Sequence, residues 1–554
     1  MGKRRYSPET VTVALAAFTA VVLNYPFWRK FFSTVAPQGA FEWLFAAAML
    51  VVLFLAVHLA LTLIAFRPTF RIVNALLLPV SAAASFFMLE YGVVIDANMV
   101  QNIFETNPAE AGDLISGKLL AYTAAFGILP AALLWRLPIG WRPLRIEIKN
   151  KLKIAAVSLP LAVAVAFPFS SNFISVFREH RELKLTLLPL NYLSAVRKYL
   201  GTSAVRANVA VKPYGEDAAR VADAMSGGSK SLFVIVVGET ARADHFSLNG
   251  YNRPTNPELA KVPELVNYVQ AYSCGTDTAQ SVPCMFSGLG RSNFSNAVAA
   301  GQENLLDILQ RTGFDVVWRD NQAGCKGVCE RVQTEILTGL SSPEFSSHSE
   351  NHDEILIDGL KQRIGALERD TVIVLHMMGS HGPAYWKRVP EKFEVFKPVC
   401  ADSQFSRCEN EAIVNAYDNT IVYTDFVLSR LIEILKAGDQ QGVETAMIYM
   451  SDHGESLGEK NMYLHGMPYA IAPVAQRHVP AVSWMSERFR ASRSIDLGCM
   501  KTNAAAPVGH DNLFHSVLGG MGIKTRVYDS ALDLFSACRP GHGAGAGTRA
   551  AAPF

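Results

Sequence analysis

Five long apolar stretches occupy the first third of the chain, and they restrict its fold more than any other feature. A helix needs about 20 mainly apolar residues to cross the hydrocarbon core of a bilayer. Each stretch is long enough, or nearly long enough, to do so, and the first reads as a retained membrane helix rather than a cleaved signal peptide. We therefore expect a membrane domain of five helices over residues 1–170, formed by approximately Val11–Phe32, Phe41–Phe66, Ile72–Val94, Leu119–Leu137 and the shorter Ile154–Phe169.

Basic residues at the ends of these stretches predict their orientation. They precede the first stretch, flank the link between the second and third, and crowd the link between the fourth and fifth, whereas Arg29 and Lys30 oppose the pattern. Because cytoplasmic loops carry the excess of Lys and Arg, the N-terminus is expected inside and everything after about Ser170 outside the cytoplasmic membrane. The residues are Lys3, Arg4, Arg5, Arg67, Arg71, Arg136, Arg142, Arg145, Lys149, Lys151 and Lys153.

The outward loop between the third and fourth stretches carries a polar row. Asn102, Thr106 and Glu110 recur every four residues, so they would share one face of a helix. The spacing fits a solvated face of an interfacial helix equally well as a polar row turned toward the site of an exported domain.

The remaining chain has the pattern of an exported α/β protein. Residues 171–230 form a connector with a helical pattern at Leu190–Leu200, residues 231–540 a compact domain, and residues 541–554 a low-complexity tail expected to be disordered. The low charged fraction of 18% fits an embedded part, and the net charge of +2 gives no indication of nucleic-acid binding.

All eight cysteines lie beyond the last apolar stretch. An even number confined to an exported domain predicts disulfides. Short spacings favour local pairs and leave Cys499 and Cys538 as the least constrained pair. For Cys325 and Cys329, zinc binding is the alternative, although it needs further thiol or imidazole ligands. The three local pairs are Cys274 with Cys284, Cys325 with Cys329, and Cys400 with Cys408.

Buried strands alternate with helices from Leu232 onward. This alternation predicts a parallel or mostly parallel sheet with helices on both faces. The expected strands are Leu232–Val237, Asp315–Trp318, Thr371–His376, Thr445–Met450 and Pro480–Trp484, and the expected helices are Leu305–Thr312, Ile355–Glu368 and Ala412–Lys436.

Three of these strands end in ionisable residues. Glu239 follows the first, His376 closes the third, and Asp452 and His453 follow the fourth. Ligands bind beyond the carboxyl ends of strands in α/β sheets, so these groups are expected to meet at one edge. Carboxylates with imidazole suit Zn²⁺ with an open position, whereas a lone strand-end histidine such as His376 is more typical of a structural role.

A stretch dense in hydroxyl groups, SCGTDTAQSVPCMFSG, could supply a nucleophile. Its candidates are Thr276, Thr278, Ser281 and Ser287, and spacing alone does not choose among them. A hydroxyl at a helix N-terminus that also touches a metal would become acidic enough to attack phosphorus. An ordinary helix N-cap is the alternative reading of this stretch.

Four motifs together resemble those of the phosphoethanolamine transferases of Gram-negative bacteria, particularly the lipid A-modifying branch that includes the mobile colistin-resistance enzymes. They are VVGETARADHFSLNGYNRPTNP, SCGTDTAQSVPCMFS, GSHGP and YMSDHGESLGEKNMYLHG. The likeness extends over nearly the whole chain. It implies a membrane α-helical N-terminal domain followed by an α/β periplasmic domain of the alkaline phosphatase/sulfatase type.

The resemblance also implies roles for individual residues. Thr278 would be the nucleophile and, with Glu239, Asp452 and His453, a ligand of a catalytic zinc. Glu455 would support this zinc or a second one, and the family's disulfides match Cys274–Cys284 and Cys400–Cys408. The implied substrate-binding residues are Asn102, Thr106, Glu110, Lys326, His381 and His465.

The implied reaction transfers phosphoethanolamine from phosphatidylethanolamine to a phosphate of lipid A in lipopolysaccharide, through a zinc-bound phospho-threonine. It lowers the negative charge of the cell surface and confers resistance to polymyxin and other cationic peptides. The protein is expected to be a monomer in the bacterial inner membrane, with its catalytic domain in the periplasm.

Several alternatives share this pattern. The acceptor could be another surface glycan, or the chain could be a glycerol-phosphate transferase of the same superfamily. A sulfatase requires Cys or Ser in a C/S-x-P-x-R context, which the run TAQSVPC lacks. A scaffold or sensor that lost catalysis would not need the complete set of metal ligands.

Overall fold

The computed structural model divides into two compact units, Met1–Val100 with Ile115–Lys198, and Gln101–Leu114 with Tyr199–Phe554. Lys3, Arg4, the tail and part of the connector lie outside the described residues, as does the side chain of Glu110. The described residues are 5–106, 108–208, 210–221, 229–338, 340, 342–348 and 350–540.

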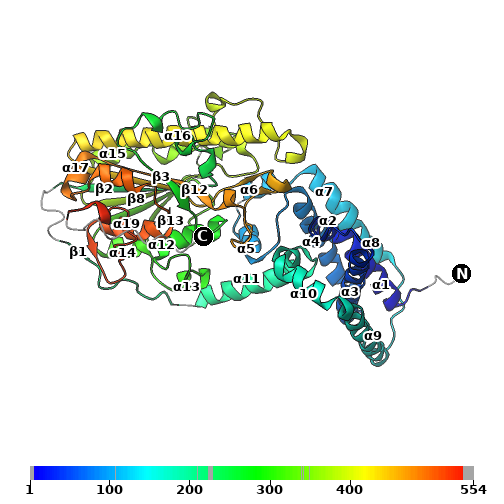
Figure 1. The fold of residues 1–554 in the computed structure, drawn as a ribbon. Coiled ribbons are helices and arrows are strands. Elements are labelled where there is room, and N and C mark those ends of the chain that lie inside the picture. Colours follow the sequence, from blue (N-terminus) through cyan, green and yellow to red (C-terminus); the bar gives the residue numbers. More distant parts are fainter. Residues whose placement is uncertain are drawn as a thin grey trace. The chain divides into compact units, whose positions relative to one another are not determined.

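Helices make up the chain as far as residue 208 (Figure 1). Four helical segments in the described part are long and apolar enough to cross a bilayer: Ala40–Ile64, Phe70–Glu90, Gly117–Arg136 and Leu144–Glu179. A bent pair of helices at the N-terminus makes a fifth if it is counted as one span. The helices are α1 Pro8–Phe18, α2 Tyr25–Val35, α3 Ala40–Ile64, α4 Phe70–Glu90, α5 Ala97–Glu105, α6 Pro108–Leu114, α7 Gly117–Thr123, α8 Leu129–Arg136, α9 Leu144–Ala166, α10 Ser170–Glu179 and α11 Leu190–Asn208.

The first predicted span is not one straight helix. A π-helical turn, Thr19–Leu23, follows α1, and the chain bends by 54° before α2. The buried amide of Asn24 stabilises the break, because it donates to the carbonyls of Thr19 (2.8 Å) and Leu188 (2.9 Å). Pro26, in the first turn of α2, lacks the N–H that a continuous helix would need.

The prediction for the fifth span was too short. The helix begins at Leu144, directly after Pro143, so several basic residues expected in the preceding link lie within it. Lys and Arg are good helix formers, and a proline before the first turn favours a helix start. The helical segment continues through α10 to Glu179.

The polar row of the outward loop does not lie on one helix. Asn102 lies in α5, which ends at Glu105, and Glu110 lies in the separate helix α6. Pro108 begins α6 and disfavours helical geometry in the residue before it, so the pattern of four cannot continue unbroken. Thr106 follows α5 and donates its hydroxyl to the carbonyl of Asn102 (2.6 Å).

An eight-stranded sheet is the centre of the second unit, within the described residues. The order is β13-β3-β12-β9-β2-β8-β4-β5, and only the pairs β9–β12 and β12–β3 are antiparallel. The prediction of a mostly parallel sheet is thus confirmed. The strands are β2 Ser231–Gly238, β3 Val266–Tyr272, β4 Asp315–Asp320, β5 Gln333–Ile336, β8 Thr371–His376, β9 Glu444–Ser451, β12 His478–Met485 and β13 Val508–Gly509.

Helices cover both faces of this sheet (Figure 1), as predicted. On one face, alternate side chains such as Phe233, Ile235 and Val237 pack into a core with α12, α14 and α19, whereas α15 and α16 cover the other. The helices are α12 Thr278–Ser287, α13 Asn296–Ala300, α14 Leu305–Arg311, α15 Leu360–Gly365, α16 Asn410–Gln440, α17 Glu487–Ser492, α18 Leu497–Asn503 and α19 Asp511–Gly520.

Short two-stranded pairs complete the second unit. They are β1 Ala219–Arg220 with β14 Ile523–Lys524, β6 Ser346–Ser347 with β7 Glu350–Asn351, and β10 Ser456–Leu457 with β11 Tyr463–Leu464.

Candidate active site

The central strands of the sheet end at the same level. In the parallel ladder Gly238 of β2 pairs with Ser451 of β9, and Val237 pairs with His376 of β8. The backbone N–H of Asp452 continues the ladder by donating to the carbonyl of Gly238 (2.9 Å). Glu239 and Asp452 therefore leave the sheet side by side at its carboxyl edge.

Two tight turns fix the position of Glu239. Thr240 has a φ of 60°, and in this left-handed conformation its N–H reaches a carboxylate oxygen of Asp452 (3.1 Å). Gly379, on the turn after β8, also has a positive φ, and a Cβ there would lie 2.7 Å from the carbonyl oxygen of Glu239. The N–H of Ser380 donates to that carbonyl (3.0 Å). The turn after β8 thus requires glycine so that it can pack against the backbone of Glu239.

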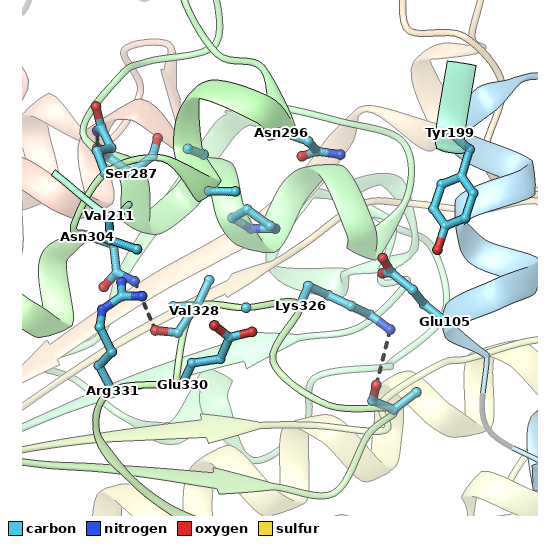
Figure 2. A pocket seen from close by; sticks show the side chains of 16 residues that line it. Glu105, Tyr199, Val211, Ser287, Asn296, Asn304, Lys326, Val328, Glu330 and Arg331 are labelled. Atoms are coloured by element: carbon cyan, nitrogen blue, oxygen red, sulfur yellow. Dashed lines mark hydrogen bonds between the residues drawn. The ribbon is translucent and has the colours of Figure 1, made fainter. Parts of the chain in front are cut away.

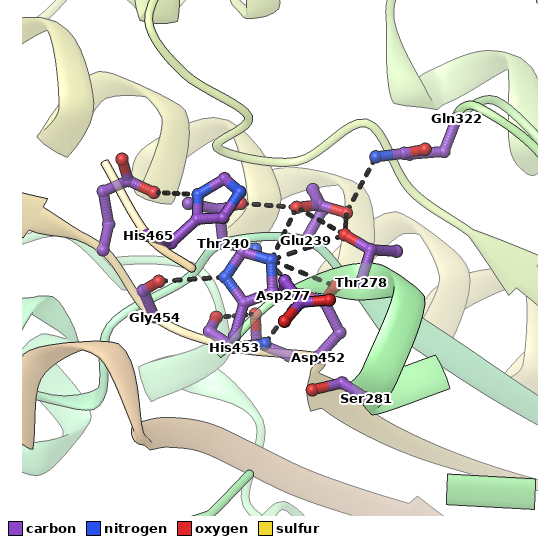
Figure 3. Close-up of polar contacts among 12 residues, drawn as sticks. Glu239, Thr240, Asp277, Thr278, Ser281, Gln322, Asp452, His453, Gly454 and His465 are labelled. Carbon is purple, nitrogen blue, oxygen red and sulfur yellow. Dashed lines mark hydrogen bonds and ion pairs between the residues drawn. The ribbon is translucent and has the colours of Figure 1, made fainter. Parts of the chain in front are cut away.

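Glu239, Asp452 and His453 form a buried cluster in which one ligand atom from each residue lies within 4.8 Å of the others (Figure 3). The Nε2 atom of His453 lies 3.3 Å from Glu239 and 3.4 Å from Asp452. Its other ring nitrogen, Nδ1, lies 2.9 Å from the carbonyl of Gly454 and is fixed by that contact. The imidazole therefore presents Nε2 to both carboxylates.

The charges in this cluster favour a cation. Burial, together with the charge of Glu239, raises the pKa of Asp452 to about 6. Burial lowers the pKa of His453, but the carboxylates of Asp452 and Glu239 outweigh it and raise the pKa to about 10. Oδ2 of Asp452 is buried and accepts no hydrogen bond from the part of the chain that the structure describes. Two carboxylates and one imidazole, with an oxygen left to coordinate, fit a divalent ion such as zinc.

Of the four hydroxyl candidates, Thr278 is the one that the fold places against this cluster, where the hydroxyl of Thr240 also donates to Glu239. Thr278 is the first residue of α12, and it donates to Oε2 of Glu239 (3.2 Å) and lies 3.4 Å from Nε2 of His453. The hydroxyls of the other three candidates bond to backbone groups instead: Thr276 to Met467, Ser281 to Gly275 and Ser287 to Cys284.

The local sequence explains why α12 begins at Thr278. The side chain of Asp277 caps the helix by accepting from the N–H of Gln280 (3.1 Å). A disulfide joins Cys274, before the helix, to Cys284 within it. The helix start, where the backbone dipole favours negative charge, is therefore held at the cluster of Glu239, Asp452 and His453.

Two further histidines lie beside the cluster. The ring of His465 lies 4.1 Å from that of His453, and the ring of His381 lies 6.0 Å from that of His465. Nδ1 of His465 is 2.9 Å from a carboxylate oxygen of Glu455. Glu455 therefore contacts the cluster through His465.

Lys326 lies at a different place, in the wall of a cavity of about 690 Å³ that Glu105, Asn296 and Arg331 also line (Figure 2). Its side chain extends toward the side of the cavity that holds Glu105 and donates to the carbonyl of Ala323 (3.1 Å). Glu105 lies between Asn102 and Thr106 in the sequence, so the loop that carries the polar row contributes to this cavity.

Two contacts of the site were not predicted from the sequence. Gln322 donates to Oε2 of Glu239 (2.9 Å), and the hydroxyl of Tyr385 donates to Glu455 (2.9 Å). Gln322 could have been found, because β4 ends at the same sheet edge, but the predicted strand stopped at Trp318. Tyr385 begins a short 3₁₀ helix, Tyr385–Arg388, after the GSHGP turn, and no sequence pattern indicated a role for it.

The three local cysteine pairs are disulfides, and Cys499 bonds to Cys538 as well. Cys325 and Cys329 are therefore not zinc ligands in this structure. The backbone of Lys326, between them, has a positive φ of 52°. The short disulfide loop holds this lysine in a conformation that residues with a side chain seldom adopt.

Comparison with known proteins identifies both parts of the chain. Residues 53–204 match the family described as phosphoethanolamine transferase EptA/EptB, and residues 231–523 match the sulfatase family. Phosphoethanolamine transferase EptA of Escherichia coli K12 is 39% identical over 95% of this chain and 96% of its own. Phosphatidylethanolamine transferase Mcr-1 of Escherichia coli is 36% identical over 88% of this chain and 91% of its own.

A solved structure matches along the same length. The integral membrane lipooligosaccharide phosphoethanolamine transferase A of Neisseria meningitidis superposes with a TM-score of 0.93 at 35% identity, covering 97% of this chain and 100% of its own. The resemblance found in the motifs is thus confirmed, as is the fold class of apolar helices followed by a sulfatase-type α/β domain. With this similarity over nearly its whole length, the chain belongs to the phosphoethanolamine transferase family.

Proposed function

We propose that this protein transfers phosphoethanolamine from phosphatidylethanolamine to a phosphate of lipid A in lipopolysaccharide, with Thr278 as the nucleophile. The observation that carries the proposal is the contact of the Thr278 hydroxyl with both Glu239 and His453 at the start of α12. The names of the relatives support the substrates. They include Kdo(2)-lipid A phosphoethanolamine 7''-transferase of Escherichia coli K12, which is 25% identical over 93% of this chain.

Glu239, Asp452 and His453 would hold one zinc ion, with Thr278 beside it. A bound zinc ion supplies Lewis acidity, which lowers the pKa of a coordinated hydroxyl and offsets negative charge on phosphate oxygens. Gln322 orients the carboxylate of Glu239 by a hydrogen bond, and Thr240 does the same for Asp452. His381, His465 and Lys326 would contact substrate, and Glu455 would hold His465 or a second ion.

The reaction would proceed in two displacements. Glu239 accepts the hydrogen bond of the Thr278 hydroxyl, which orients a lone pair of Oγ toward phosphorus. As Oγ forms the new bond to phosphorus, its proton would pass to Glu239, the bond to the diacylglycerol oxygen would break, and that oxygen would take up the proton. A phosphate oxygen of lipid A would then attack the phospho-threonine, the bond from phosphorus to Oγ would break, and Thr278 would take up the proton that the lipid A phosphate releases.

The helical first unit fits this reaction, because donor and acceptor are both lipids. We infer an inner-membrane protein with its N-terminus in the cytoplasm and its second unit in the periplasm, acting as a monomer. Adding phosphoethanolamine would lower the negative charge of the outer surface and so the affinity of polymyxin for it. Asn102, Thr106 and Glu110 would contribute to lipid binding from the outward loop.

Mass spectrometry of lipid A tests the proposal. Cells that make the wild-type protein should carry a phosphoethanolamine group on lipid A, and cells that make Thr278→Ala should not. Retention of the wild-type level by Thr278→Ala would exclude this nucleophile. Exposing purified protein to phosphatidylethanolamine labelled in its headgroup, and then digesting it, should recover the label on Thr278.

The same experiment separates the alternatives. Label recovered on Thr278 together with unmodified lipid A would indicate another surface glycan as the acceptor. Labelling from phosphatidylglycerol instead of phosphatidylethanolamine would indicate a glycerol-phosphate transferase.

A further inference from the structure

A buried ion-pair cluster in the second unit lies outside the metal site. Asp113 of α6 pairs through one carboxylate oxygen with Lys387 and through the other with Arg388 (3.0 Å). Arg388 pairs in addition with Glu350 of β7. The Asp113 and Arg388 side chains are 5% and 2% exposed, so the contact is largely shielded from water.

Arg388 also connects this cluster to the active site. Its Nε atom donates to the backbone carbonyl of His381 (3.0 Å). The guanidinium group of Arg388 thus contacts three segments: α6 through Asp113, β7 through Glu350, and the turn that carries His381. A lysine could not reproduce this arrangement, because the fork of the guanidinium is planar and offers donors in several directions.

In the part of the chain that the structure describes, two carboxylates face two cations in this cluster. Removing the Asp113 charge would take one carboxylate away from both Lys387 and the shielded Arg388, which is costly for a buried pair. The helices α5 and α6 are short, with nine and seven residues, so they cannot hold their position by themselves. The position of the loop therefore depends on contacts such as this one.

We propose that Asp113 is a positioning residue of the transfer reaction, which acts through Arg388 on the His381 turn. Residues 101–114, which belong to the second unit, would thereby complete its active site. The proposal rests on the proposed function, in which His381 contacts the phosphate. It adds that the site loses its geometry when the loop is released, although Asp113 itself touches no substrate.

The test uses the full-length protein and measures two quantities. Hydrogen exchange reports the opening of residues 101–114 and 378–384, and labelling of Thr278 from saturating phosphatidylethanolamine reports the first displacement. In Asp113→Asn, exchange should rise in both segments, and labelling should slow by about tenfold or more, because small misplacements of catalytic groups are costly. The zinc content should remain that of the wild type.

Glu444→Gln is the matched control. Glu444 also forms a shielded ion pair, with Arg493 (2.5 Å), but it lies at the beginning of β9, at the edge of the sheet opposite Asp452. This variant should be less stable, yet exchange in the two segments and labelling should be unchanged. Lys387→Gln removes one of the two cations that hold Asp113, so it should give an intermediate rise in exchange and an intermediate slowing of labelling, and it serves if Asp113→Asn does not fold.

The proposal is overturned if Asp113→Asn, or Lys387→Gln in its place, leaves exchange in residues 378–384 unchanged or labels Thr278 at the wild-type rate. It is also overturned if Glu444→Gln reproduces the effects. Failure of the proposed function looks different, because wild-type protein would then not be labelled at Thr278 at all, whatever the exchange shows.

Discussion

Glu455 and His465 are joined by a contact of 2.9 Å between a carboxylate oxygen and Nδ1, and the second oxygen of Glu455 accepts from Tyr385. Burial, reinforced by the charge of Glu455, raises the pKa of Tyr385 well above its ordinary value, so its hydroxyl remains a donor. The imidazole of His465 is therefore fixed by one carboxylate, which is itself fixed by a phenol. This arrangement fixes the orientation of the His465 ring beside that of His453.

Glu455→Gln should lower the rate of transfer by up to about a hundredfold, because the neutral amide holds the imidazole by a weaker hydrogen bond than the carboxylate does. Tyr385→Phe should have a smaller effect, about tenfold or less, since it removes one hydrogen bond worth about 1 kcal/mol. Both rates can be measured as labelled lipid A formed per minute.

Zinc content separates this role from a metal-ligand role. Metal analysis should find the wild-type zinc content in Tyr385→Phe. Glu455→Gln should keep the zinc ion that Glu239, Asp452 and His453 would hold. If Tyr385→Phe lowered the rate as much as Glu455→Gln, the arrangement in which Glu455 holds His465 and Tyr385 only supports Glu455 would be wrong.

Gly379→Ala should weaken metal binding. A Cβ at this position would lie 2.7 Å from the carbonyl oxygen of Glu239, and the positive φ adds backbone strain of about 1 kcal/mol. The backbone of Glu239 must then move, and its carboxylate moves with it. Titration of the metal-free protein with zinc should show a lower affinity, and transfer should fall in proportion.

Gly359→Ala is the control for strain alone. Gly359 also has a positive φ, of 71°, but a Cβ there would meet nothing within 4 Å. It should lower the unfolding temperature without changing zinc affinity. Equal zinc affinities in the two variants would show that the close approach of Gly379 to Glu239 is not needed.

The meeting of Glu239, Asp452 and His453 was predictable because it follows from local sequence and one rule of topology. Runs such as TVIVLH mark buried strands, and parallel strands deliver Glu239, Asp452 and His453 to one edge without further information. The choice of Thr278 from its residues alone was not possible. It depends on where α12 begins and on which neighbouring hydroxyls bond to distant backbone, as Thr276 does to Met467.

Other parts of the fold were hidden for different physical reasons. β3 was missed because its burial alternates between inside and outside, so it lacks the continuous apolar run of a central strand. The predicted helix Ile355–Glu368 is reduced to a 3₁₀ turn and the short α15, since Gly359 interrupts it. The proposed role of Asp113 depends on contacts among α6, β7 and the segment around Arg388, which are far apart in the sequence. No local sequence pattern predicts such contacts.

Removal of the disulfide Cys499–Cys538 should cost more stability, whereas removal of Cys274–Cys284 should cost more activity. Cys274–Cys284 and Cys499–Cys538 close loops of 10 and 39 residues, for which chain entropy predicts losses of about 3 and 4 kcal/mol on removal. The double variant Cys274→Ala, Cys284→Ala should be the less active one, because that bond holds the start of α12 at the cluster of Glu239, Asp452 and His453. Unfolding and transfer assays on both double variants check the order.

The stability of the second unit should fall between about pH 4 and pH 7 through Asp425 of α16. Burial raises the pKa of this carboxyl to about 7. The hydrogen bonds that it accepts from the N–H groups of Glu258 and Leu259 lower the pKa and offset part of this rise. In this range the folded protein keeps a proton that the unfolded chain releases, so raising the pH favours unfolding, by up to about 4 kcal/mol. Asp425→Asn cannot release the proton. The unfolding temperature of the wild type should therefore fall relative to that of Asp425→Asn from pH 5 to pH 8, and a constant difference would contradict this assignment.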